Sequence, residues 1–115
     1  MLTILHNPRC SKSRQALELL QQRQVELTVI DYQKHPLSKA ELASVLAKLG
    51  IPARALLRTK EDDYKELQLD NPTLSDDVLM EAMLSHPKLM ERPVVFDNTR
   101  AVIGRPPEQV LDLLA

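Results

Sequence analysis

The first 30 residues follow a strand–helix–strand pattern, and this feature restricts the fold more than any other in the chain. Residues 2–5 form a short apolar run that predicts a buried strand. A helical pattern follows from Ser11, which we expect to cap the helix, to about Arg23. Apolar residues then alternate over 25–30, which predicts a second strand. Two strands joined by one helix at this spacing form a βαβ unit, so the strands should be parallel and the crossover right-handed.

The middle of the chain is predicted to be helical. Ser38 and Glu41 have the spacing of a capping box at the start of a helix that Gly50 can end. Ser75 is a second capping residue ahead of another apolar helical pattern. The helices expected here cover about residues 38–49, 52–57, 61–69 and 75–85.

The pattern returns to strands near the C-terminus. Segments 94–96 and 100–103 flank a turn-like Asp-Asn-Thr, which predicts a hairpin, and a last helix follows residues 104–107. The whole order is βαβ, several helices, then ββα. We therefore expect an α/β fold in which helices cover both faces of a small mixed sheet. The length suits a single domain over residues 1–115, with a helical insertion at about 38–88.

The single cysteine, Cys10, lies where the first strand ends and the first helix begins. The first backbone N–H groups of a helix have no intrahelical partner and form a natural anion site. The segment from His6 to Arg14 also carries several cationic groups and no acid. A helix N-terminus and nearby cations lower the pKa of a cysteine from about 8.5 into a range of roughly 3.5–7.5. We therefore interpret Cys10 as a nucleophile in an anion site rather than a buried apolar residue.

Composition excludes several classes of function. The formal net charge is −1, so nothing indicates a nucleic-acid or membrane surface. One cysteine cannot form an internal disulfide, which together with the missing signal peptide predicts a reducing cytoplasm. No apolar run approaches the roughly 20 residues of a membrane span. No CxxC…CxxC or HExxH pattern predicts a metal site.

Three separated motifs resemble those of the glutaredoxin-linked arsenate reductase family. They have the family's order and spacing over nearly the whole chain, and they are His6-Asn7-Pro8-x-Cys10-x-x-Ser13-Arg14, Glu91-Arg92-Pro93-Val94-Val95 and Ile103-Gly104-Arg105-Pro106-Pro107. The resemblance implies a thioredoxin-like fold with extra helices between its βαβ and ββα halves. It also implies a cis-proline before the third strand, and the Arg92–Pro93 bond is the candidate.

The resemblance implies a reaction as well. In this family the cysteine attacks arsenate and forms a thiol–arsenate adduct. Glutathione attacks the adduct, glutaredoxin resolves it, and arsenite leaves. Glutathione is then a co-substrate and glutaredoxin a partner, and no cofactor is bound.

The site residues are also implied by the resemblance. Cys10 is the nucleophile, and His6 matches the histidine that helps to keep the thiol ionised. Ser13 and Arg14 match the polar and the basic neighbour of the thiolate. The three arginines that bind the oxyanion in this family are matched by Arg58, Arg92 and Arg105. A guanidinium suits this task because it stays charged and offers its donors in a fixed fork.

Two other interpretations of the same fold remain open. The protein could be a thiol–disulfide or glutathione-dependent oxidoreductase with a substrate other than arsenate, since Cys10-x-x-Ser13 resembles the motif of a monothiol glutaredoxin. It could also be a redox transcription regulator of the Spx type, although the oxidation-sensing members carry a CxxC that is absent here. A low-molecular-weight phosphatase requires C-x5-R, and the C-x3-R of this chain does not fit.

Overall fold

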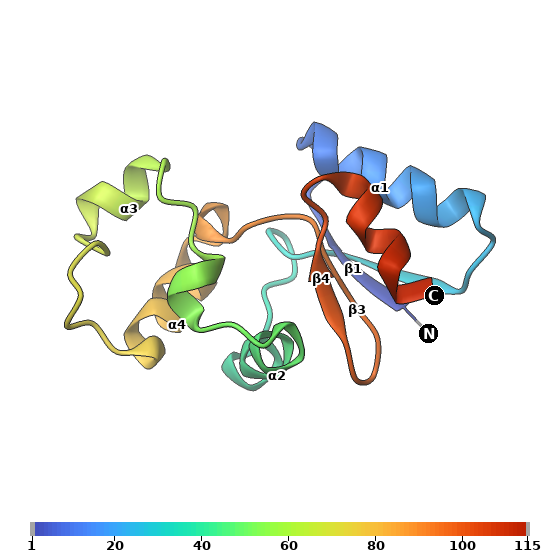
Figure 1. Cartoon of the computed structure of the whole chain (residues 1–115). Helices are drawn as coiled ribbons and strands as arrows, with labels where there is room; N and C mark the ends of the chain where they lie inside the picture. Colours follow the sequence, from blue (N-terminus) through green and yellow to red (C-terminus); the bar gives the residue numbers. More distant parts are fainter. Residues whose placement is uncertain (1, 115) are drawn as a thin grey trace. The chain divides into compact units, whose positions relative to one another are not determined.

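The computed structural model describes residues 2–114, which fall into two compact units. Within the described residues, the first unit comprises 2–35 and 92–114, and the second comprises 36–91. The first unit contains β1 (Leu2–His6), α1 (Ser11–Gln22), β2 (Leu27–Asp31), β3 (Val94–Phe96), β4 (Ala101–Ile103) and the 3-10 helix η3 (Pro107–Leu114) (Figure 1). The second contains α2 (Lys39–Leu49), η1 (Ala53–Leu56), α3 (Asp62–Glu66), α4 (Asp76–Ser85) and η2 (Pro87–Leu89). The expected single domain with an insertion at about 38–88 stays a prediction.

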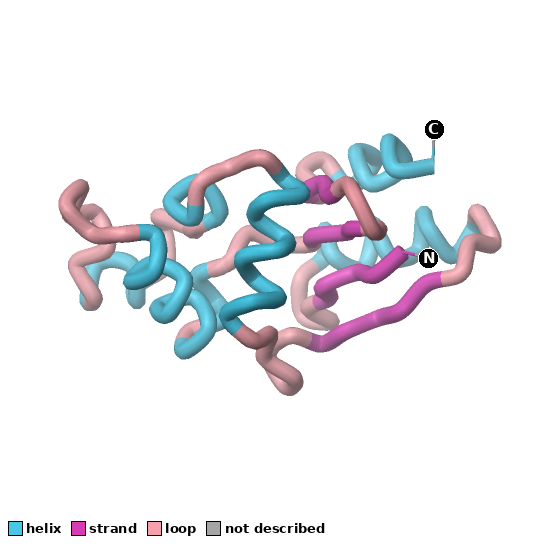
Figure 2. The backbone as a smooth tube through the Cα atoms, turned by 90° about the horizontal axis from the view of Figure 1, so that it is seen from below, coloured by secondary structure: helices cyan, strands magenta, loops and turns pink. Residues whose placement is uncertain are grey.

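The four strands form one mixed sheet in the order β2-β1-β3-β4. β1 and β2 are parallel, as predicted for the βαβ unit, and Ile4 pairs with Val29. β3 is antiparallel to β1, with Ile4 opposite Val95, and β4 completes the predicted hairpin. The strands lie side by side in Figure 2. The expected mixed sheet within an α/β chain is confirmed.

One face of this sheet carries the core of the first unit. Side chains alternate along a strand, so Leu2 and Ile4 of β1 point to the same face. They pack with Val95 of β3 and with buried apolar side chains of α1 and η3, namely Ala16, Leu20, Val110 and Leu113. The amphipathic pattern seen in the sequence thus places α1 against β1. This packing fixes the end of β1, and with it the loop that holds Cys10.

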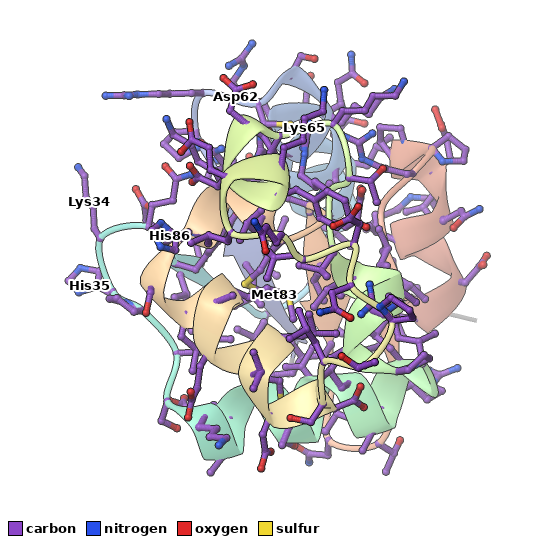
Figure 3. The ribbon with its side chains drawn as sticks, turned by 90° about the vertical axis from the view of Figure 1, so that its left-hand side faces the viewer. Lys34, His35, Asp62, Lys65, Met83 and His86 are labelled. Atoms are coloured by element: carbon purple, nitrogen blue, oxygen red, sulfur yellow. The ribbon has the colours of Figure 1, made fainter. Side chains whose placement is uncertain are left out.

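Two capping motifs define the long helices of the second unit. Ser38 Oγ accepts the Glu41 N–H at 3.1 Å, and a Glu41 carboxylate oxygen accepts the Ser38 N–H at 2.9 Å. Gly50 ends α2 in the left-handed region, at φ 68°. Ser75 caps α4, whose Met83 is fully buried (Figure 3). The capping residues predicted for these helices are therefore confirmed.

Several predicted boundaries are wrong by a few residues. Cys10, not Ser11, is the N-cap of α1, because the chain remains extended there (φ −96°, ψ 123°). β2 begins at Leu27 rather than Val25, since pairing with β1 starts at Leu2↔Leu27. The helix predicted over 61–69 covers only Asp62–Glu66, and the last helix is a 3-10 helix. These differences leave the order of elements unchanged.

Candidate active site

Cys10 occupies the junction between β1 and α1, in a loop that its own backbone holds in place. The Cys10 N–H donates to the Asn7 carbonyl at 3.0 Å, and the Arg9 N–H donates to Asn7 Oδ1, also at 3.0 Å. Asn7 is 4% exposed, so this turn is anchored in the interior while the Cys10 side chain remains partly exposed. No side-chain cap is made by Cys10, although it stands at the N-cap. The sulfur is therefore accessible at the start of a helix.

His6 and Ser13 form a buried pair beneath this loop. His6 Nδ1 lies 2.7 Å from Ser13 Oγ, which also accepts the Asn7 N–H at 3.0 Å. Because Ser13 Oγ accepts that bond, its own proton is available for His6 Nδ1. Burial lowers the pKa of His6, Asp31 opposes this effect, and Arg14 adds to it. His6 is thus a neutral imidazole that positions Ser13, and an influence on the thiol through Ser13 remains a prediction.

The surroundings of Cys10 favour the thiolate. Partial burial raises the pKa of the thiol, whereas the Ser13 N–H, the Arg92 side chain and the Lys12 N–H lower it because their donors favour the thiolate, as does the charge of Arg92. The net result is a pKa of Cys10 below the ordinary value. Two of these donors are backbone groups of the first turn of α1, the groups that have no partner within a helix. These groups favour a negative charge on the sulfur, and the binding of an oxyanion beside it stays a prediction.

Arg92 lies beside the sulfur, although it is more than 80 residues away in the sequence. It precedes β3 through a cis peptide bond to Pro93, which confirms the predicted cis-proline. Burial lowers the pKa of Arg92, while Tyr32 and Cys10 raise it, and the net shift is upward. The guanidinium is thus a permanent cation that interacts with both the thiol and a phenol.

Tyr32 is the neighbour of this site that sequence reasoning missed. It follows β2 directly and is 2% exposed. β1 and β2 are parallel, so their carboxyl ends lie at the same edge of the sheet, and residues that follow them can meet there. That rule, applied to the buried aromatic residue after the second strand, could have identified Tyr32.

Arg105 and Arg14 contact the backbone of the same site. Arg105 Nε donates to the Arg92 carbonyl at 3.2 Å, and a second cis peptide bond joins Arg105 to Pro106. Arg14 Nη1 donates to the Pro8 carbonyl at 2.8 Å, so it braces the loop before Cys10. Both residues are exposed, so an incoming anion can reach them.

Arg58 belongs to the second unit, and its relation to Cys10 stays a prediction. Its N–H donates to the Leu89 carbonyl at 2.7 Å, and its Nε lies 3.4 Å from a Glu61 carboxylate oxygen. Arg58 Nη1 is buried without a hydrogen-bond partner within residues 2–114. Buried donors are rarely left unsatisfied in proteins, and a bound ligand is one way to satisfy them. This atom is therefore suited to an anion.

Within residues 2–114, no group of three or more His, Cys, Asp or Glu side chains could hold a metal ion. Within the same residues, no helix is both long and apolar enough to cross a membrane.

Gly104 supports the site through close packing, and its replacement by alanine tests this. A Cβ at Gly104 would lie 2.8 Å from Pro93 Cγ and 3.0 Å from Val110 Cγ1. Because the Pro93 ring must shift to relieve the clash, we expect Gly104→Ala to lower the free energy of unfolding by about 1–3 kcal/mol. Arg92 is bonded to Pro93, so activity should fall as well. Chemical denaturation and steady-state kinetics measure the two effects.

Gly50→Ala is the matched control for that variant. No atom lies within 4 Å of a Cβ at Gly50, and the cost there, about 1–2 kcal/mol, comes only from its positive φ. We expect Gly50→Ala to lower the free energy of unfolding by an amount similar to Gly104→Ala, but without a loss of activity. Full activity in Gly104→Ala would show that Pro93 can move without disturbing Arg92.

Comparison with known proteins gives a consistent result. The sequence profile of the ArsC family matches residues 5–113. The chain is 53% identical over 112 residues to the uncharacterised protein YfgD of Escherichia coli strain K12, covering 96% of this chain and 94% of that one. It is 48% identical over 110 residues to an arsenate reductase of Neisseria meningitidis serogroup A, covering 95% of this chain and 94% of the relative.

A solved structure agrees with these sequence relationships. The arsenate reductase from Vibrio cholerae superposes with a TM-score of 0.93 at 49% identity, covering 96% of this chain and 95% of that one. The thioredoxin-like fold expected from the motifs is therefore confirmed.

Proposed function

Because this chain belongs to the ArsC family, we propose that it is an arsenate reductase in which the Cys10 thiolate attacks the arsenic atom of arsenate. One observation carries the proposal: the single thiol, Cys10, lies at a helix start and beside Arg92, and these surroundings lower its pKa. A thiolate is a far better nucleophile than a thiol. The lowered pKa increases the fraction of Cys10 that is thiolate at neutral pH, and this favours attack by its sulfur.

The charges around the sulfur also fit the substrate. Arsenate is a tetrahedral oxyanion, and a thiolate repels it unless cations offset the repulsion. Arg92 and Arg105 are joined by a hydrogen bond at this site, and Arg14 braces the loop beside it. We include Arg58 in the oxyanion set because its buried Nη1 lacks a partner within the described chain. Fixed donors of this kind also stabilise the charge that develops in the transition state.

The proposed reaction uses one protein thiol and two external thiols. The Cys10 sulfur bonds to arsenic, and one arsenate oxygen leaves as water after protonation. The sulfur of glutathione then bonds to the same arsenic atom, and a second oxygen leaves as water. Arsenic remains As(V) through both steps, since neither transfers electrons to it.

Reduction occurs when glutaredoxin removes the glutathione. A glutaredoxin thiolate attacks the glutathione sulfur and forms a disulfide with it. The electron pair of the broken S–As bond stays on arsenic, which becomes As(III). Hydrolysis of the remaining bond releases arsenite and restores the Cys10 thiol. The scheme needs no second protein cysteine, in agreement with a chain that has only one.

This chemistry places the protein in a compartment that holds reduced glutathione. Cytosolic thiols are kept reduced by glutathione and thioredoxin systems. We therefore assign the protein to the cytoplasm, with glutathione as co-substrate and glutaredoxin as partner.

A coupled assay tests the proposed function. The purified protein is mixed with glutathione, glutaredoxin and glutathione reductase, and NADPH consumption is followed with and without arsenate. We expect consumption that requires arsenate, and arsenite as the product. Consumption that needs a disulfide substrate instead of arsenate would favour the glutathione-dependent oxidoreductase with another substrate. If neither is reduced but RNA polymerase co-purifies with the chain, the Spx-type regulator is favoured.

A further inference from the structure

A cavity of about 230 Å³ opens beside the loop that carries Cys10, and its lining carries both signs of charge. The lining residues are Asn7, Pro8, Arg9, Asp31, Gln33 and Lys34. We propose that this cavity binds the γ-glutamyl end of glutathione, with Asp31 contacting the α-ammonium group and Arg9 and Lys34 the α-carboxylate. The inference rests on the function proposed above, because it names where the thiol co-substrate is held.

The carboxylate in this cavity has a defined position. Asp31 is the last residue of β2 and pairs in register with His6 of β1. Its Oδ1 accepts the Gln33 N–H at 3.2 Å, and its backbone carbonyl accepts the Lys34 and His35 N–H groups at 3.1 and 2.8 Å. These bonds fold the chain tightly after β2 and keep the partly exposed carboxylate at the cavity wall.

The cations lie on two different segments. Arg9 precedes the catalytic cysteine in the loop after β1, and Lys34 lies on the loop after β2, where Figure 3 labels it. Both side chains are exposed, so each can move onto an incoming carboxylate. Gln33 adds an amide that can donate or accept. The cavity therefore offers an anion site and a cation site to one small ligand.

This pairing of charges selects one part of glutathione. The glycyl end carries only a carboxylate, and a purely basic pocket would suit it. The γ-glutamyl end carries an ammonium group and a carboxylate on the same carbon, and it needs opposite charges close together. Arsenate has no positive group, so it gains nothing from Asp31. The cavity thus fits the amino-acid head of the thiol donor better than it fits the oxyanion.

The cavity lies next to the cysteine along the chain. Arg9, which lines the cavity, directly precedes Cys10, and consecutive Cα atoms are about 3.8 Å apart. The arm from the γ-glutamyl α-carbon to the glutathione sulfur contains roughly as many bonds as two extended residues, about 7 Å. A head held in the cavity can therefore present its sulfur to an arsenic atom bound to Cys10.

Binding of two thioethers to the full chain tests this assignment. S-methylglutathione and its N-acetyl derivative differ at the ammonium group, and neither has a thiol, so neither can reduce arsenic. NMR titration of the backbone amides gives both affinities. We expect the wild type to prefer the free amine by about threefold to fivefold, the range of a partly exposed ion pair. Asp31→Asn should remove the preference, because the amide cannot pair with an ammonium group.

Variants of the cations test the other half of the cavity. Lys34→Gln should lower the affinity for S-methylglutathione by about threefold but leave the preference for the free amine over the N-acetyl derivative intact. Lys60→Gln removes the same charge from an exposed site in the second unit and should bind like the wild type. Asp31→Asn leaves His6 uncharged, since Asp31 is the group that raises the pKa of His6. The active site is thereby kept comparable across the set.

The outcomes separate this inference from the proposed function. Equal affinity for both thioethers in the wild type, or the same preference in Asp31→Asn, overturns the assignment even if arsenate is reduced. A preference that Asp31→Asn abolishes supports it even if arsenate is not the substrate. Should Asp31→Asn fail to fold, Lys34→Gln decides, and unchanged binding in that variant would count against the cavity.

Discussion

Cys10→Ser is expected to abolish arsenate reduction, with a fall in turnover of more than about a thousandfold. The chain has no other cysteine, so no second sulfur can bond to arsenic. A serine hydroxyl at this place has a pKa far above that of a thiol, and the donors around Cys10 cannot ionise it at neutral pH. The coupled NADPH assay measures the loss, and retained turnover would show that the sulfur is not the nucleophile.

The same variant should be slightly more stable than the wild type. Cys10 is the N-cap of α1 and makes no side-chain cap, whereas serine is among the preferred N-cap residues. A cap of this kind contributes about 0.5–1 kcal/mol, which raises the melting temperature by a few degrees. Cys10→Ala is the matched control, since it also lacks the sulfur but gains no cap. A melting temperature that rises in Cys10→Ser but not in Cys10→Ala would show that the wild type keeps the thiol in place of a stabilising helix cap.

The elements that sequence predicted well are those specified by neighbouring residues. A capping box needs only Ser38 and Glu41, and Gly50 alone supplies the left-handed end of α2. The β-hairpin at β3 and β4 is likewise set by a short turn between two apolar segments. Such signals lie within a few residues of each other, so they can be read without knowledge of the tertiary fold.

The errors arose where tertiary contacts decide the outcome. Ser11 is as good a capping residue as any, yet the loop anchored by Asn7 keeps the chain extended one residue earlier, at Cys10. The first residues of the predicted second strand lie outside the register with β1, which begins at Leu2↔Leu27, although the Leu2 N–H still donates to the Glu26 carbonyl at 3.3 Å. Local propensity fixes the type of element, and its neighbours in space fix its ends.

In the candidate site, too, the residues close to Cys10 in sequence could be predicted, and those that reach it from distant segments were harder to find. The loop around Cys10 is contiguous, so its charge and its position at a helix start were visible in the sequence. Arg92 was found only through the family motif, and Tyr32 was missed, because each reaches the site through the folding of a distant segment. His6 contacts Ser13, a contact that no charge pattern could indicate, and its expected effect on the thiol stays a prediction.

Arg92→Gln is expected to lower kcat/KM for arsenate by about a hundredfold or more, the range seen when one transition-state donor is removed. Glutamine keeps much of the length and can still donate hydrogen bonds, but it carries no charge. The loss should therefore report the guanidinium charge beside Cys10 rather than a collapsed loop. Arg23→Gln, a change at the exposed C-cap of α1, is the matched control and should retain activity.

The pH dependence of Cys10 alkylation gives an independent readout of Arg92. The pKa of Cys10 is lowered, so the thiolate should persist as pH falls below the ordinary thiol range, and alkylation should lose rate only as pH passes through that lowered pKa. Loss of the Arg92 charge removes one of the causes that lower the pKa of Cys10, so the midpoint in Arg92→Gln must move to higher pH. In the variant, the Ser13 and Lys12 N–H groups still favour the thiolate and burial still opposes it. An unchanged midpoint together with a large loss of turnover would assign Arg92 to the oxyanion alone, and unchanged values of both would remove it from the site.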